Sequence, residues 1–192
     1  ISSRPIAGTR KQTNAQKRQR FIAELKHDPK EASEHAMLVD LCRNDLGRVC
    51  EFGSVNIDKF MEIIPYRYVI HTESEISGML KAKQGFFEIF RALFPGGTIT
   101  GVPKLRTQEI IHELEPTPRS LYTGSLGYIS LNGDMDFNIM IRSILCTKDK
   151  TYTYAGGGIT YDADVTREYQ ETLSKAKPQI LAILSELKGA TL

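Results

Sequence analysis

The spacing of apolar residues predicts two helices in the first quarter of the chain. Residues 13–27 have a helix-forming composition, and one side of that helix carries Phe21, Ile22 and Leu25. A second helix is predicted to begin at Asp28-Pro29, because proline fits the first helical turn, and to end at Gly47. Five apolar residues form the stripe that we expect it to bury: Ala32, Met37, Leu38, Leu41 and Leu46.

Two runs rich in β-branched and aromatic residues, Val49 to Ile57 and Tyr66 to Leu80, predict strands. A single strand over the second run would place four residues on one face: Val69, His71, Glu73 and Glu75. Helices are then predicted at 84–93 and 103–115, the second with Pro103 at its first position. The glycine-rich residues 95–101 between them read as a loop.

The pattern changes to strands from Gly124 onward. Asn132-Gly133 is a two-residue hairpin signal and residues 148–150 predict a second turn, so we expect an antiparallel meander. A last helix at about 165–188 is predicted to bury an inner stripe despite Pro178: Leu173, Ile180, Leu181 and Leu184. The elements together indicate an α+β fold.

Composition narrows the class of protein. The 192 residues are 41% hydrophobic, enough for one substantial core, and the length favours one domain. The net charge of +2 comes from mixed signs, which does not call for nucleic acid as a partner. Three cysteines without C-x-x-C spacing fit reduced thiols in a cytoplasmic protein. No apolar run approaches the roughly 20 residues of a membrane span, so no membrane partner is expected.

Two Glu-x-x-Glu pairs, Glu31/Glu34 and Glu168/Glu171, are the first candidates for chemistry. Residues three apart on a helix project side by side. If both helices pack together, four carboxylates without neutralising lysine or arginine would repel one another, and Mg²⁺ would be a natural counter-charge. Such pairs are also ordinary on solvent-facing helices, so spacing alone favours a surface role.

Other polar and glycine-rich positions could bind an anion. The backbone N–H groups of Gly156, Gly157 and Gly158 can approach a carboxylate closely, although a flexible connection is the alternative. Arg142, expected on a strand with Ile141 and Ile144, and Tyr122, just before another strand, could grip a planar carboxylate. Alone, each of these residues is more often structural, as is His71 in an apolar strand. The 95–104 segment fails the phosphate-loop pattern, because Val102-Pro103 separates Gly101 from Lys104.

The stretch from Glu31 to Val49, EASEHAMLVDLCRNDLGRV, resembles a highly specific segment of the chorismate-utilising enzymes. The resemblance continues in order along the chain, through Pro5 to Thr9, Pro95 to Lys104, Glu113 to Pro116, Gly156 to Ile159, and Glu168 to Thr172. It covers essentially the whole chain and implies the family's sandwich of mainly antiparallel sheets flanked by helices.

The resemblance also implies a ligand set. It assigns Mg²⁺ to Glu34 and Glu171, supported by Glu31 and Glu168. It places His71 and Thr98 beside the reacting ring. Contacts to chorismate are implied for a further group of residues: Gly8, Thr9, Tyr122, Arg142, Gly156, Gly157, Gly158 and Lys175.

Within the family, the motifs are most similar to component I of aminodeoxychorismate synthase and of anthranilate synthase, which take ammonia from a glutamine amidotransferase partner. Pro95 to Gly101, Thr123 to Gly127 and Asp136 to Ile139 favour the aminodeoxychorismate branch. Ala7 favours anthranilate synthase, because some aminodeoxychorismate synthases carry a nucleophilic lysine there. An isochorismate or salicylate synthase, and a non-catalytic module that only binds the amidotransferase, are further readings.

The family's domain is about twice this length, and the Pro-Ile-x-Gly-Thr motif normally lies near its middle. Residues 1–192 therefore read as the C-terminal portion of a chorismate-binding domain, without its first strands and an upstream glutamate. We expect this portion alone to be inactive.

Overall fold

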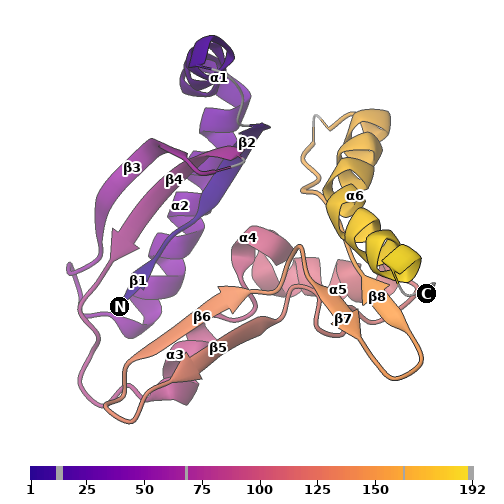
Figure 1. Cartoon of the computed structure of the whole chain (residues 1–192). Helices are drawn as coiled ribbons and strands as arrows, with labels where there is room; N and C mark the ends of the chain where they lie inside the picture. Colours follow the sequence, from indigo (N-terminus) through magenta and orange to yellow (C-terminus); the bar gives the residue numbers. More distant parts are fainter. Residues whose placement is uncertain (12–14, 68, 162, 190–192) are drawn as a thin grey trace. The chain divides into compact units, whose positions relative to one another are not determined.

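The computed structural model describes the whole chain except residues 12–14, 68, 162 and 190–192. The backbone forms two compact units, Ile1–Thr98 and Ile99–Leu192. The first contains one four-stranded sheet, and the second contains two separate two-stranded sheets (Figure 1). Every strand pairing is antiparallel and helices accompany the strands in both units, which is the α+β class that the sequence predicts.

The sheet of the first unit is organised around β4 (Val69–Ser77). β3 (Asn56–Pro65) pairs along one edge of β4, while β1 (Ser2–Ser3) and β2 (Ile6–Lys11) share the other. Burial alternates along β4, as expected of a strand with one covered face: the buried residues are Ile70, Thr72, Ser74 and Ile76. The prediction that Val69, His71, Glu73 and Glu75 share one face is confirmed, and this face is the less buried one.

Helix α2 (Pro29–Val49) lies along this sheet (Figure 1). The core cluster joins it to β4 and to α3 (Phe86–Leu93), and consists of Val39, Leu46, Val49, Cys50, Ile76 and Ala92. Buried positions on α2 are three, four or seven residues apart, from His35 through Val39 and Leu46 to Val49, so they share one face of the helix. The prediction that Met37 is buried is wrong, since its side chain is 42% exposed. The buried face of α2 contains the polar His35 in its place.

His35 links α2 to the sheet. Its side chain is 1% exposed, and its Nε2 lies 2.6 Å from the Ser74 hydroxyl oxygen. That oxygen also accepts a hydrogen bond of 2.9 Å from the backbone N–H of Met61, where β3 bulges with a φ of 54°. Burial lowers the pKa of His35, so its ring is neutral at pH 7. Its Nδ1 has no hydrogen-bond partner among the described residues.

Most of the predicted helices are confirmed with shifted ends. α1 (Ala15–His27) and the start of α2 at Pro29 agree with the sequence, and Leu25 is buried as expected. α2 runs through Gly47 to Val49, so the predicted end is wrong; its interior packing continues one turn further. The strand expected at 49–57 is instead a helix end and a turn, and β3 begins only at Asn56.

The segment after α3 is more ordered than a loop. It contains the short helix α4 (Gly97–Thr100), and α5 (Lys104–Leu114) follows with Pro103 as its N-cap residue instead of its first helical residue.

The second unit contains two hairpins and a long helix. β5 (Ser125–Ile129) pairs with β6 (Met135–Ile139) across the predicted Asn132-Gly133 turn, and β7 (Ile144–Cys146) pairs with β8 (Thr151–Thr153). The predicted meander is therefore divided in two. The break falls at Arg142, which has a φ of 53° and lies outside the described strands. The prediction that Arg142 lies on a strand is therefore wrong.

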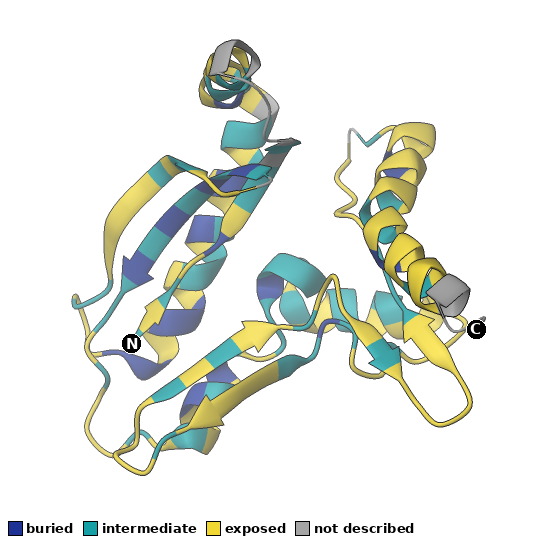
Figure 2. Ribbon diagram, viewed as in Figure 1, coloured by how far each residue is buried: buried dark blue, intermediate teal, exposed yellow. Residues whose placement is uncertain are grey.

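Helix α6 (Val165–Gly189) exposes much of its surface (Figure 2). The expected inner stripe at Leu173, Ile180, Leu181 and Leu184 is exposed, because the strand that α6 contacts most, β8, has only three residues. Among the described helices none is long and apolar enough to cross a membrane. All three cysteines are free thiols.

Replacing Ser74 with alanine should destabilise the first unit. Ser74→Ala removes the acceptor of the Met61 N–H and the partner of a buried imidazole, so we expect a loss of about 1–3 kcal/mol in the free energy of unfolding. Ser33→Ala is the matched control, because its exposed hydroxyl donates to the Pro29 carbonyl on the same helix; it should change stability by less than about 0.5 kcal/mol. Urea unfolding followed by circular dichroism measures both, and equal midpoints would contradict the role given to Ser74.

Candidate functional site

A glycine bulge in β2 brings several predicted residues of the first unit together. The register of β2 against β4 shifts between Ala7 and Thr9, and Gly8 adopts a φ of +59°. A Cβ atom at Gly8 would lie 3.0 Å from Glu31 Oε2 and 3.4 Å from Thr72 Oγ1. The backbone at Gly8 therefore fits closely between α2 and β4, in a space that only glycine leaves open.

His71 faces the same bulge from β4. Its Nδ1 lies 3.1 Å from the Gly8 carbonyl oxygen, and its ring meets the Tyr66 ring edge-on with the centroids 5.7 Å apart. Because a carbonyl can only accept, Nδ1 must carry the proton and donate it. In the neutral ring the lone pair is then on Nε2, the arrangement a proton-transfer group needs.

Glu31 is held at the start of α2. Its backbone N–H donates to the side chain of Asp28 at 3.3 Å, which caps the helix, and its Oε1 receives a hydrogen bond of 3.1 Å from Arg10. Glu34 follows one turn later and is half-buried. Arg10, two residues beyond Gly8, was missed by the sequence reasoning, although a basic residue so close to the glycine motif was a usable signal.

Two predicted residues of this unit are located less fully. Thr98 lies half-buried on α4, beside Gly97, whose Cβ position would be 3.5 Å from Leu41 Cδ1. The backbone of Thr9 pairs with His71, while the Thr9 side chain lies outside what the structure describes. The roles predicted for Thr98 and Thr9 stay predictions.

In the second unit, the glycine loop lies between Tyr122 and α6. A Cβ atom at Gly156 would be 2.8 Å from the Tyr122 hydroxyl oxygen. One at Gly157 would be 3.5 Å from Glu168 Oε2 and 3.8 Å from Lys175 Nζ. Gly158 has open space around its Cβ position. The loop backbone therefore approaches a phenol, a carboxylate and an ammonium group within a few residues.

Tyr122 is oriented by its aromatic and charged neighbours. Its ring stacks on Tyr154 with centroids 5.6 Å apart and an interplanar angle of 12°. Burial raises the pKa of Tyr122, the charge of Glu115 raises it further and those of Arg119 and Arg142 oppose the shift, so the phenol is protonated at neutral pH. Arg142 itself is exposed, and its influence on Tyr122 shows that the two lie within electrostatic range.

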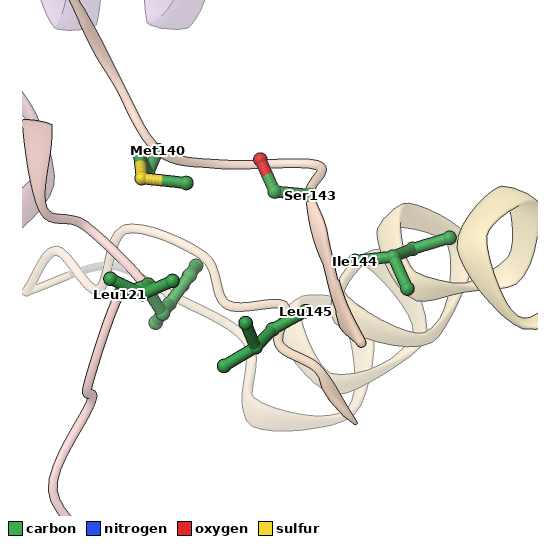
Figure 3. Close-up of a pocket in the computed structure, with 6 residues that line it drawn as sticks. Leu121, Met140, Ser143, Ile144 and Leu145 are labelled. Carbon is green, nitrogen blue, oxygen red and sulfur yellow. The ribbon is translucent and has the colours of Figure 1, made fainter. Parts of the chain in front are cut away.

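Two hollows border this tyrosine. A small apolar pocket of about 30 Å³ is shown in Figure 3; its labelled lining residues are Leu121, Met140, Ser143, Ile144 and Leu145. A larger cavity of about 210 Å³ is bordered by Arg119, Tyr122 and Tyr154. Sequence reasoning missed Arg119 and its partner Glu115, although their spacing of four residues was a signal for an ion pair.

The charges of the two glutamate pairs differ from the expectation. Each pair has a basic partner, since Arg10 binds Glu31 and Lys175 Nζ lies 2.6 Å from Glu171 Oε1. The premise of carboxylates without neutralising lysine or arginine is therefore wrong. Each unit contributes one pair, and among the described residues no group of three or more His, Cys, Asp or Glu side chains could hold a metal ion.

The carboxylates nevertheless suit a hard cation. Oxygen ligands in an i, i+3 arrangement are those that Mg²⁺ accepts, and Glu168 is only 9% exposed beside the loop backbone. The donor set is thus compatible with Mg²⁺.

Comparison with known proteins identifies similar chains. The family model described as chorismate binding enzyme matches residues 1–180. Aminodeoxychorismate synthase component 1 of Bacillus subtilis strain 168 is 48% identical over 177 residues, which are 92% of this chain and 38% of that relative. Anthranilate synthase component 1 of Lactococcus lactis is 44% identical over 178 residues, which are 92% of this chain and 39% of the relative.

Solved structures are similar as well. The crystal structure of anthranilate synthase component I from Streptococcus pneumoniae TIGR4 matches with a TM-score of 0.83 and 41% identity, over 92% of this chain and 39% of that one. The menaquinone-specific isochorismate synthase of Escherichia coli matches with a TM-score of 0.80 and 26% identity, over 92% and 40%. The expected fold is confirmed, and the chain spans less than half the length of each of these relatives.

Alanine at Gly156 should disturb Tyr122. Gly156 does not have a positive φ, so alanine at this position introduces no backbone strain. Gly156→Ala therefore tests the steric contact between the added methyl group and Tyr122. Its Cβ would lie 2.8 Å from a hydroxyl that the Tyr154 stack holds in place, and we expect a destabilisation of about 1–3 kcal/mol.

Gly158→Ala is the matched control, because its Cβ position is open. It should alter stability by less than about 0.5 kcal/mol. Thermal unfolding with the tyrosine signal in near-ultraviolet circular dichroism measures both variants. An unchanged signal and stability in Gly156→Ala would contradict the contact.

Proposed function

The chain belongs to the family of chorismate binding enzymes, and we propose that it forms part of the Mg²⁺-dependent site of an enzyme that aminates chorismate. The proposed product is 4-amino-4-deoxychorismate, on the route to p-aminobenzoate and folate. Ammonia would come from a glutamine amidotransferase partner.

The observation that carries the proposal is the group of donors around the glycine loop. Chorismate has two carboxylates and a ring hydroxyl that must leave. The Gly156 and Gly157 backbone, the protonated Tyr122 hydroxyl and the Lys175 ammonium lie along one short path, with Arg142 in electrostatic range of Tyr122. Backbone N–H groups, a phenol and the fork of an arginine are the donors that bind carboxylates well.

The chemistry of the side chains supports the proposed cation, because carboxylate oxygens are the ligands that Mg²⁺ prefers. Glu34 and Glu171 are the proposed ligands, with Glu31 and Glu168 in support. When bound, Mg²⁺ would supply positive charge to hold and orient the ring carboxylate.

His71 is proposed to move the proton that accompanies loss of the ring hydroxyl. Its Nδ1–H donates to the Gly8 carbonyl, so Nε2 is the nitrogen that exchanges the proton. Thr98 is proposed beside the same ring, and Gly8 and Thr9 would contact the substrate. Water must be excluded while ammonia reaches the ring, so delivery from the partner is expected in place of diffusion from bulk solvent.

Anthranilate synthesis is the second candidate, and Ala7 favours it. Ala7 pairs with Thr72 in the sheet and carries no nucleophile, so amination must proceed without a covalent step at this position. The similarity to an aminodeoxychorismate synthase and to anthranilate synthases is comparable, at 48% and 44% identity.

Product analysis distinguishes the two reactions. The full-length protein, supplied with chorismate, ammonium and Mg²⁺, is expected to form 4-amino-4-deoxychorismate, detected by chromatography with mass spectrometry. Formation of anthranilate and pyruvate would support anthranilate synthesis, the second candidate function, instead. Consumption of neither chorismate nor ammonia would refute both.

Replacing a proposed ligand should remove Mg²⁺ dependence together with activity. Glu171→Gln keeps the shape of the side chain but removes its negative charge. We expect kcat/KM to fall by more than the roughly 10- to 100-fold that is typical when a residue supporting a metal ligand is replaced. Glu186→Gln, on the exposed surface of the same helix, is the control and should leave activity unchanged. Calorimetric titration with Mg²⁺ gives an independent measurement. Unaltered binding in Glu171→Gln would exclude it as a ligand.

A further inference from the structure

Arg119 is one of the most firmly held basic side chains of the second unit. Its Nη2 donates to Glu115 Oε1 at 2.6 Å and its Nε donates to Glu115 Oε2 at 2.9 Å, which is a two-point contact with the carboxylate. Its Nη1 donates to Thr123 Oγ1 at 3.4 Å, and Thr123 is buried. Glu115 follows directly on the last turn of α5, so Arg119 is fixed to a rigid element.

The guanidinium of Arg119 also lies over the ring of Tyr122. Its Cζ is 5.6 Å from the ring centroid, within the range of a cation–π contact. The backbone N–H of Tyr122 donates to the Arg119 carbonyl at 2.9 Å, so both residues belong to one turn. The Tyr122 ring therefore has two planar neighbours, Arg119 and Tyr154, while its hydroxyl is set against Gly156.

This geometry separates Arg119 from the donors that would bind substrate. Its fork is committed to Glu115, whose charge neutralises it, and its remaining contacts are to Thr123 and to an aromatic face. An arginine engaged in this way has little left to offer a substrate carboxylate. It can, however, determine where the Tyr122 hydroxyl lies.

We propose that Arg119, clamped by Glu115, is the positioning residue that holds the Tyr122 ring so that its hydroxyl is presented to chorismate beside the Gly156 backbone. The proposal rests on the proposed function, because it takes Tyr122 as a substrate contact. Arg119 acts through Tyr122 and does not touch chorismate itself.

A double-mutant cycle in the full-length protein tests this role. Tyr122→Phe removes the hydroxyl, and Arg119→Ala removes the group that fixes the ring. Each should raise the KM for chorismate by about 3- to 30-fold with kcat little changed, the pattern of a lost binding contact. Because Arg119 acts through the hydroxyl, the double variant should have the KM of Tyr122→Phe alone.

Two further variants separate positioning from general structure. Arg106→Ala removes an arginine that binds Glu109 at 2.8 Å on the exposed face of α5, and it should leave the KM unchanged. Arg119→Lys keeps the charge but cannot make the two-point contact, so it should not restore the KM. Thermal unfolding of each variant shows whether it is folded; a merely structural role would lower kcat and stability together.

The outcomes are distinct. Multiplying effects in the double variant, or an unchanged KM in Arg119→Ala when Tyr122→Phe raises it, would overturn the positioning role and leave the proposed function standing. An unchanged KM in Tyr122→Phe would overturn both the positioning role and the substrate contact of Tyr122. Absence of chorismate turnover in the unmodified protein would overturn the proposed function and this proposal with it.

Discussion

Close approach of glycine backbone to charged side chains is the constraint on which both units depend. At Gly8 a left-handed bulge allows the chain to lie against Glu31 and to direct its carbonyl to His71. At Gly156 the absence of a side chain admits the Tyr122 hydroxyl, and Gly157 lies against the first turns of α6. A methyl group at Gly8 or at Gly156 would enter the van der Waals space of a polar atom. Any larger residue would have to move the groups proposed to act on the substrate.

The acidic helices show how such a site can be stable before a substrate or cation is present. Two neighbouring glutamates on one helix repel each other. In each pair here, one glutamate forms a salt bridge with a basic residue. In the first unit the ion pair fixes Glu31, a proposed supporting group. In the second unit the ion pair fixes Glu171, a proposed ligand.

Local patterns predicted the strand faces, the hairpins and most helices, because these follow from periodicity and turn residues within a few positions. β3 was missed because its register shifts near Met61, which breaks the alternation that identifies a strand. Met37 was misassigned because a buried histidine, hydrogen-bonded through Nε2 to a serine 39 residues away, could not be recognised as part of the core. The candidate site followed from a family resemblance, whereas the ion pairs of Arg10 and Arg119 were established by three-dimensional contacts, their sequence positions being only a hint.

The two arginines that sequence reasoning missed, Arg10 and Arg119, share one property: each forms a salt bridge with a glutamate. Arg10 and Arg119 therefore belong to ion pairs that, each taken as a whole, have no net charge. Their effect is on geometry: one restrains Glu31 beside the Gly8 bulge, and the other restrains Tyr122 beside Gly156. Sequence reasoning selected side chains that could meet an anionic substrate directly, and it gave no weight to side chains that orient them. Preorganisation of the proposed site nevertheless depends on such groups, because a donor that must first be ordered binds more weakly than one already in place.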